Sequence, residues 1–324
     1  MRFIQQTKPF QQGACVVANT RFTLSMAFHE WEVKLVNSQH RFVRQGVVAT
    51  LFVLFALPFC RTYLFAESAY TGCGGEFVSP TNTAYEARVI ELVNEQRAAQ
   101  GLPPMKFNTN LTDAARYHAA DMSQDDYFNH QTQDRINGAL VKVCNWSDRL
   151  KVYYTIYNGL AENIASGYPS PESVIEGWMN SSGHRTNILG NYREIGVGFY
   201  NNYWVQDFGD RADSFPVIIN KEAQQTNSPQ VTLYIYGSWQ QMRLRNDDDS
   251  WGEWQSFSQE TPWTLRDVNG ERRVDVELRN SNTTVSTSDT IILANNTTPT
   301  PTPIPTPLSP TDVKFFLYLP TVQR

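Results

Sequence analysis

Apolar residues recur with a helical period in two stretches that follow residue 80. The first begins at a capping box, Thr83–Glu86, and ends at Gly101, and the second runs from about Asn110 to Asp125. Both patterns predict amphipathic helices with one buried face. The inward positions are Tyr85, Val89, Leu92 and Val93 in the first helix, and Leu111, Ala114, Ala115, His118 and Met122 in the second.

A third helix is predicted after Ser170, which can cap it, with Pro171 at its first position. Its apolar face is formed by Val174, Ile175, Trp178 and Met179. Ser181, Ser182 and Gly183 interrupt the helical pattern, and His184 follows at this break. A histidine at a helix edge can face a cleft instead of a core.

Strand patterns follow the third helix. The segments 195–200 and 203–209 are joined by Asn201 and Asn202, a pair suited to a tight hairpin turn. The pattern between Gln131 and Asn158 is irregular and predicts a long surface segment held by Trp146 and Leu150. From about Phe215 apolar and polar residues alternate with period two, which predicts a β-sandwich of about 80 residues. The fold class is therefore α+β, with an all-β module after it.

The ends of the chain have a different character. Arg41 and Arg44 precede a short apolar run and then small residues, the order of a signal peptide, although an uncleaved anchor is the alternative. A Pro/Thr-rich stretch near the C-terminus predicts an extended stalk. The short apolar tail after it is either a sorting or anchoring signal or a strand that packs on the sandwich. The expected parts are an N-terminal extension and signal peptide (1–69), a spacer (70–83), the α+β domain (84–210), the sandwich (215–294), the stalk (295–312) and the tail (313–324).

Charge and cysteine usage narrow the classes of function. The net charge of −5 over 324 residues gives no electrostatic footprint for nucleic acid. Only Cys73 and Cys144 lie beyond the predicted leader, in a spacing that matches no zinc motif. They can form one bridge outside the cell, but the sequence leaves open whether they pair.

Three polar residues are candidates for a site. His130 and His184 lie at the edges of elements, and Glu162 is a carboxylate in an apolar stretch that needs a partner once it is buried. Together they suit a zinc ion with an open fourth position, acid–base chemistry, or a hydrogen-bonded cluster that only stabilises loops. His118 is better explained as a core histidine. A nucleophile formed by Ser181 or Ser182 with His184 is disfavoured, because no nucleophile-elbow glycines surround either serine.

Taken together, the stretches YFNH, GLAENIASG, GWMNSSGHRTNIL, EIGVGFY and YWVQDFG resemble the CAP superfamily of cysteine-rich secretory, antigen 5 and pathogenesis-related proteins, in its bacterial SCP-like form. The resemblance implies an α-β-α sandwich with a cleft of two histidines and two acids, which bind zinc in some members. Carried over by position, these residues are His130, Glu162 and His184, with Ser181 where the second acid is expected. Residues 215–294 separately resemble an Ig-like sandwich of bacterial surface proteins.

Three functions compete on these grounds. The first is a secreted or cell-surface, non-catalytic binding module for an apolar ligand, a cell-wall component or a surface partner. The second is an exported metal-dependent hydrolase in which His130, Glu162 and His184 hold zinc and its water. The third is a passive adhesion protein whose polar cluster is purely structural. Fold membership alone does not choose among them.

Overall fold

The computed structural model describes residues 70–295, 315–319 and 321–323. The predicted leader, and the predicted stalk from residue 296, lie outside this part of the chain. The helices of the described residues are α1 (Thr83–Ala99), α2 (Thr109–Asp125), α3 (Trp146–Tyr153), α4 (Pro171–Asn180) and α5 (Ser182–Ile188). No helix among them is long and apolar enough to cross a membrane.

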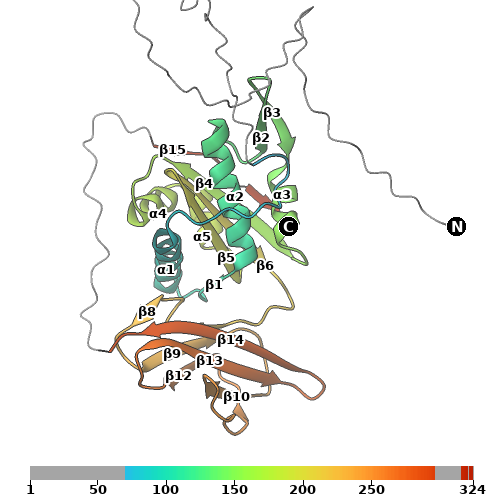
Figure 1. The fold of residues 1–324 in the computed structure, drawn as a ribbon. Coiled ribbons are helices and arrows are strands. Elements are labelled where there is room, and N and C mark those ends of the chain that lie inside the picture. The colour runs from blue at the N-terminus through green and yellow to red at the C-terminus, as the bar shows by residue number, and fades with distance from the viewer. Residues whose placement is uncertain (1–69, 296–314, 320, 324) are drawn as a thin grey trace, which may run out of the picture. The chain divides into compact units, whose positions relative to one another are not determined.

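One mixed sheet organises the first part of the chain, with helices on both faces (Figure 1). Its strand order is β1-β5-β6-β4, and the C-terminal strands β15 and β16 both pair with β4. α1, α4 and α5 bury their apolar residues against one face, and α2 and α3 cover the other. The expected α-β-α sandwich is thus confirmed. The strands are β1 (Lys106–Phe107), β4 (Gly159–Ser166), β5 (Glu194–Tyr200), β6 (Tyr203–Asp210), β15 (Phe316–Leu317) and β16 (Thr321–Gln323).

The helix α2 lies directly on β5. At Gly196 and Gly198 a Cβ atom would collide with the α2 backbone, at Leu111 and Thr112 and at Ala115 and Arg116 respectively. Glycine at these two positions therefore permits a backbone-to-backbone approach that any side chain would prevent.

The residues that begin and end the helices agree with the predictions except at two positions. Ser170 caps α4 with a complete capping box, as predicted. The cap of α1 is Asn82, whose side chain accepts from the Tyr85 N–H, so the helix begins one residue after this cap and Thr83 is inside it. Beyond α4 only Ser181 breaks the helix, and His184 lies in the first turn of a second helix, α5.

The interval between Gln131 and Asn158 was expected to be irregular, and this expectation is wrong. It forms a hairpin of β2 (Thr132–Ile136) and β3 (Ala139–Cys144), followed by α3. Asn137 and Gly138 form its turn with positive φ angles of 51° and 84°, the backbone that an Asn-Gly pair adopts readily. Cys144, at the end of β3, forms a disulfide with Cys73, which ties the hairpin to the segment before α1.

The β-rich part that follows consists of two sheets around one apolar core. Val231, Leu233 and Ile235 are buried in one sheet and Val274, Val276 and Leu278 in the other, as their period-two spacing predicts. The larger sheet has the order β11-β10-β13-β14-β8 and the smaller one β12-β9-β7. The strands are β7 (Val217–Ile219), β8 (Gln225–Thr226), β9 (Gln230–Ile235), β10 (Gln241–Asn246), β11 (Gln255–Ser256), β12 (Glu260–Thr264), β13 (Gly270–Arg279) and β14 (Thr284–Leu293).

The apolar C-terminal tail does form strands, but its location differs from the expectation. It does not pack on the sandwich: β15 and β16 run antiparallel to β4 and extend the sheet of the α-β-α domain. The physical reason is that β4 would otherwise be an edge strand, with one row of backbone N–H and C=O groups unpaired.

Candidate functional site

The site is built around Glu162, which β4 carries in the interior of the domain. Alternation along the strand points Glu162 to the face covered by α2 and α3, and the side chain is fully buried. Its Oε1 accepts from Nδ1 of His130 at 2.7 Å, and its Oε2 accepts from the guanidinium of Arg149 on α3. Burial alone would raise the pKa of Glu162, but Arg149, His118 and His130 together outweigh it and hold this pKa below the usual range.

Arg149 is a central member of the cluster that sequence reasoning missed. Its side chain is fully buried, and one terminal nitrogen donates to the carbonyl of His130 at 2.9 Å and to Oγ1 of Thr132 at 2.8 Å. Arg149 therefore fixes both the carboxylate that orients His130 and the backbone of His130 itself. No periodicity or motif in the sequence marks this arginine, because it acts across the tertiary structure.

Asp207 is the second buried acid, and it too was missed. It lies directly opposite Glu162 in the β4–β6 ladder and is fully buried. Burial and the neighbouring charge of Glu162 raise the pKa of Asp207 well above its usual range, which favours the neutral form of this carboxyl. An acid inside the apolar stretch YWVQDFG was the available signal, since an ionised carboxylate in a buried strand is costly.

His184 comes from the other face of the sheet. The neighbour of Glu162, Asn163, points to that face and donates to the carbonyl of His184 at 3.2 Å. Nδ1 of His184 lies 2.7 Å from Oγ of Ser181, the residue that stands where the resemblance expects an acid. Burial lowers the pKa of His184 to about 4, despite an opposing hydrogen bond to the carbonyl of Tyr318. The imidazole is therefore neutral at physiological pH.

The two histidines meet at the edge of β4, where the C-terminal segment is docked. Nε2 of His184 bonds the carbonyl oxygen of Tyr318, and Nε2 of His130 bonds the carbonyl oxygen of Leu319. A carbonyl only accepts, so both Nε2 atoms carry protons. Nδ1 of His130 faces the Glu162 carboxylate.

The structure brings together all four residues that the sequence proposed for the cleft. His130, Glu162 and His184 converge, and Ser181 supports His184. The cleft was expected to be open, and the structure differs in this respect. Both imidazoles are only 2% exposed, because the C-terminal segment lies over them. His118 is a buried core histidine, as expected, and its Nε2 lies 2.9 Å from the carbonyl of Asn129, next to His130.

The donor set fits the predicted zinc ion only in part. Zinc sites usually employ at least three protein ligands. The cleft offers two imidazole Nε2 atoms, whereas both oxygens of Glu162 are engaged by His130 and Arg149. Glu162 is thus placed to orient a ligating histidine rather than to ligate. Among the described residues, the carboxylates of Asp121, Asp125 and Asp134 lie close enough together to hold a metal ion, and this group is different from the one in the cleft. Zinc at the cleft stays a prediction.

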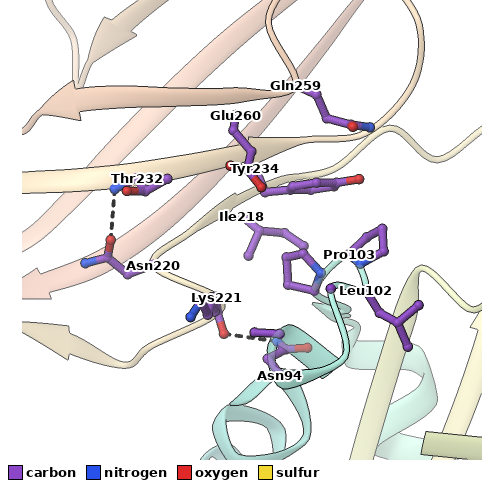
Figure 2. Close-up of a pocket in the computed structure, with 13 residues that line it drawn as sticks. Asn94, Leu102, Pro103, Ile218, Asn220, Lys221, Thr232, Tyr234, Gln259 and Glu260 are labelled. Carbon is purple, nitrogen blue, oxygen red and sulfur yellow. Dashed lines mark hydrogen bonds between the residues drawn. The ribbon is translucent and has the colours of Figure 1, made fainter. Parts of the chain in front are cut away.

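A separate hollow of about 610 Å³ lies elsewhere in the described chain (Figure 2). Asn94 and the loop after α1 form one side, and Ile218, Lys221 and Tyr234 belong to the other. Asn94 donates to the carbonyl of Lys221 at 3.0 Å across it. The residues that line this hollow include no histidine or cysteine, and the histidines of the candidate site lie at the edge of β4.

These observations define a class of protein: an α-β-α sandwich with two hydrogen-bonded histidines at the edge of its sheet, followed by a β-rich module. Residues 90–208 match the family model described as CAP, the cysteine-rich secretory protein family. The chain therefore carries a CAP domain, and the segment matched by the model contains His130, Glu162, Ser181 and His184.

Two curated relatives come from Bacillus subtilis (strain 168). Uncharacterized protein YkwD is 39% identical over 129 residues, which are 39% of this chain and 47% of that protein. Uncharacterized membrane protein YlbC is 31% identical over 127 residues, 39% of this chain and 34% of that protein. The matches thus span less than half the length of either relative. The crystal structure of an extracellular protein containing a SCP domain from Bacillus anthracis is 27% identical with a TM-score of 0.36, covering 40% of this chain and 41% of that one.

Proposed function

We propose that this chain is an exported protein whose CAP domain is a non-catalytic binding module, with the cleft of His130, Glu162, Ser181 and His184 as its binding site. One observation carries the proposal: both imidazoles already use their outward Nε2–H groups to hold a polypeptide segment. Arg149 and Glu162 immobilise His130, and Ser181 immobilises His184. Donors held in this way lose little freedom when a ligand binds.

The contacts within the cleft favour binding over a serine–histidine hydrolase. Ser181 contacts Nδ1 of His184, but the far nitrogen of that ring meets a carbonyl, not a carboxylate that would orient a general base. Glu162 is held by Arg149 and His130 and is fully buried. The hydrolase hypothesis therefore has weaker support than the binding hypothesis.

Export is supported by chemistry within the chain. The disulfide between Cys73 and Cys144 belongs to an oxidising compartment. The basic-then-apolar order before residue 60 is the pattern of a leader. Protease treatment of intact bacterial cells that express the full tagged chain would degrade a surface-displayed protein. Full protection, with the chain found in the cytoplasmic fraction, would contradict export.

A ligand panel on the full chain tests the binding function. Candidates are soluble wall fragments, long-chain apolar compounds and extended peptides, each titrated against the wild type, His184→Ala and Thr186→Ala. Thr186 is exposed on the same short helix and serves as the matched control. We expect saturable binding by one class, weakened about tenfold in His184→Ala and unchanged in Thr186→Ala. Turnover of a peptide or ester that disappears in His184→Ala would overturn the non-catalytic assignment. Passive adhesion predicts instead that His130→Ala lowers the melting temperature and changes no binding.

A further inference from the structure

We propose that the cleft is a groove for extended peptides that recognises the main chain of its ligand, and that the C-terminal segment with residues 315–319 and 321–323 is its resident, displaceable occupant. This inference rests on the proposed binding function and names the ligand class. It follows from three features of the described chain: the edge of β4, the placement of the two imidazoles, and the exposure of the docked side chains.

The first feature is strand addition at β4. β15 pairs Phe316 with Ser166 and Leu317 with Ala165, and β16 pairs Thr321 with Glu162, Val322 with Ala161 and Gln323 with Leu160. Both strands run antiparallel to β4 and lie on its side away from β6. An extended segment that completes an open sheet edge gains affinity from backbone hydrogen bonds, whatever its side chains are.

The second feature is a one-residue shift of register between the two strands. Leu317 lies opposite Ala165, but Thr321 lies opposite Glu162, so the segment gains one residue over β4 between these points. Two consecutive carbonyls in this interval, of Tyr318 and Leu319, bond the imidazoles of His184 and His130. The imidazoles thus bind the part of the segment where the regular ladder is interrupted. Asn187 adds a contact to the carbonyl of Thr321 at 3.4 Å.

The third feature is that several side chains of the docked segment remain exposed to solvent. Leu319 is 80% exposed although its carbonyl is bound, and Phe316 is 49% exposed. Leu317 is the member that packs against the apolar core. Selectivity is therefore modest: the groove favours an apolar residue at the position of Leu317 and aromatic rings that can contact Phe128.

Aromatic contacts define that second preference. The ring of Phe128 lies 6.2 Å from that of Phe316 and 6.0 Å from that of Tyr318, and His130 lies edge-on to Tyr318 at 5.3 Å. Such pairs add to the area that they bury. The ligand class is accordingly an extended peptide with aromatic residues flanking one aliphatic residue.

The occupant is tethered, which determines how an outside peptide would compete. Asn295, the last described residue of the β-rich part, and Phe315 are joined by residues 296–314. Because the segment is covalently attached, its effective concentration at the groove is set by the linker and does not fall on dilution. An external peptide must exceed that concentration to enter the intact chain, whereas a chain whose tail has been released is open to it.

The test uses the full chain with a protease-recognition site placed within residues 301–307, so that the protein folds before its tail is cut. The probe is a fluorescent synthetic peptide of residues 314–324. We expect 1:1 binding to the cut chain after the released tail is dialysed away, and binding at least a hundredfold weaker to the uncut chain. His184→Ala in the cut chain should weaken binding about tenfold, and Thr186→Ala should not.

Changes in the probe separate main-chain from side-chain recognition. Replacing Leu319 of the peptide by Ala should leave binding unchanged, because that side chain is exposed. N-methylation of single amides on either side of the bulge should abolish binding at alternating positions, the signature of a β-ladder. Loss of binding on Leu319→Ala with no effect of N-methylation would overturn main-chain recognition.

Two outcomes distinguish this inference from the proposed function. If the cut chain binds a wall fragment or an apolar compound in the ligand panel but not the peptide, the inference fails and the binding function stands. If neither the cut nor the uncut chain binds any member of the panel, both fail. A dimer of the uncut chain that dissociates on cutting would show that a second copy supplies the tail, which overturns occupancy by the same chain.

Discussion

The hydroxyl of Ser181 lies 2.7 Å from Nδ1 of His184 and orients that ring. Because Nε2 faces the carbonyl of Tyr318, the proton is on Nε2, and the serine donates to Nδ1. The neutral hydroxyl of Ser181 thus orients the ring. A carboxylate in its place would also favour the protonated, charged imidazole. His184 is a neutral hydrogen-bond donor as a result.

The first prediction concerns this neutral state. The folded pKa of His184 is about 4, below the ordinary value of 6.5, so the unfolded chain binds a proton in the interval between them that the folded chain does not. Stability contributed by His184 is therefore complete above pH 6.5 and is lost as the pH falls toward 4. Denaturation of both proteins across this range should show that the stability of the wild type relative to His184→Gln falls as the pH is lowered. Equal slopes for the two proteins would contradict the lowered pKa.

The ion pair of Glu162 and Arg149 gives the second prediction. Both side chains are fully buried, so Glu162→Gln leaves the Arg149 charge without its partner and should cost about 3–5 kcal/mol in the free energy of unfolding. Asp148→Asn is the matched control, because it removes the exposed pair of Asp148 with Lys151 and should change stability by less than about 1 kcal/mol. Urea denaturation of both variants provides the measurement. A loss in Glu162→Gln no larger than that in the control would mean that the pair does not organise the cleft.

Asp207 should behave in the opposite way. Its raised pKa favours the neutral carboxyl in the folded protein, so Asp207→Asn substitutes a neutral group of similar size. We expect a change within about 1 kcal/mol at pH 7, or a gain. The sign follows from the raised pKa: the folded chain retains a proton that the unfolded chain releases above pH 3.8, so the wild type loses stability as the pH rises through this window. The variant should flatten that decline, and a steep decline in both proteins would refute the assignment.

The zinc hypothesis makes a prediction that involves the tail. The two Nε2 atoms that would ligate zinc are the atoms that bond Tyr318 and Leu319. Zinc and the tail therefore compete, and calorimetric titration should show zinc binding at least tenfold weaker in the intact chain than after the tail is released. Stoichiometric zinc in the purified intact chain, removed by His130→Ala, would contradict this competition.

The disulfide yields the fifth prediction. Cys73 and Cys144 are 71 residues apart in the sequence, and a loop of that length corresponds to about 4 kcal/mol in the chain-entropy account. The double variant Cys73→Ser with Cys144→Ser should lose up to this amount, and reduction of the wild type should reproduce the loss. Thermal melts with and without reductant would measure both. An unchanged melting temperature would show that other contacts alone hold the β2–β3 hairpin.

The local pattern of apolar and polar residues predicted those helices and strands that bury one face. The hairpin turn at Asn201 and Asn202 was predicted because apolar strands flank it, and both residues have positive φ. The turn at Asn137 and Gly138 was missed, although its backbone is similar. Its strands are mostly exposed, so no buried face imposes alternation on their sequence. The Asn-Gly pair itself was the usable signal.

The candidate site was predictable to the extent that its residues are chemically unusual in their local setting. A carboxylate at position 162 within an apolar stretch required a partner, and a cluster with His130 and His184 was predicted from the sequence; of the two, His130 is the histidine that bonds it. Arg149 was not, because an arginine in a short helix gives no local sign of burial. The docking of the tail was also missed, since it depends on an open edge at β4 about 150 residues earlier in the chain.

The close contact of α2 with β5 links distant parts of the domain to the cleft. α2 ends just before the loop that carries His130, and the helix rests at Gly198 on the β5 backbone with no intervening side chain. Even an added methyl group there would displace the whole helix, and its far end would carry the imidazole out of line with Glu162. The position of His130 therefore depends on the missing Cβ atom of Gly198, which lies some distance from any group that contacts a ligand.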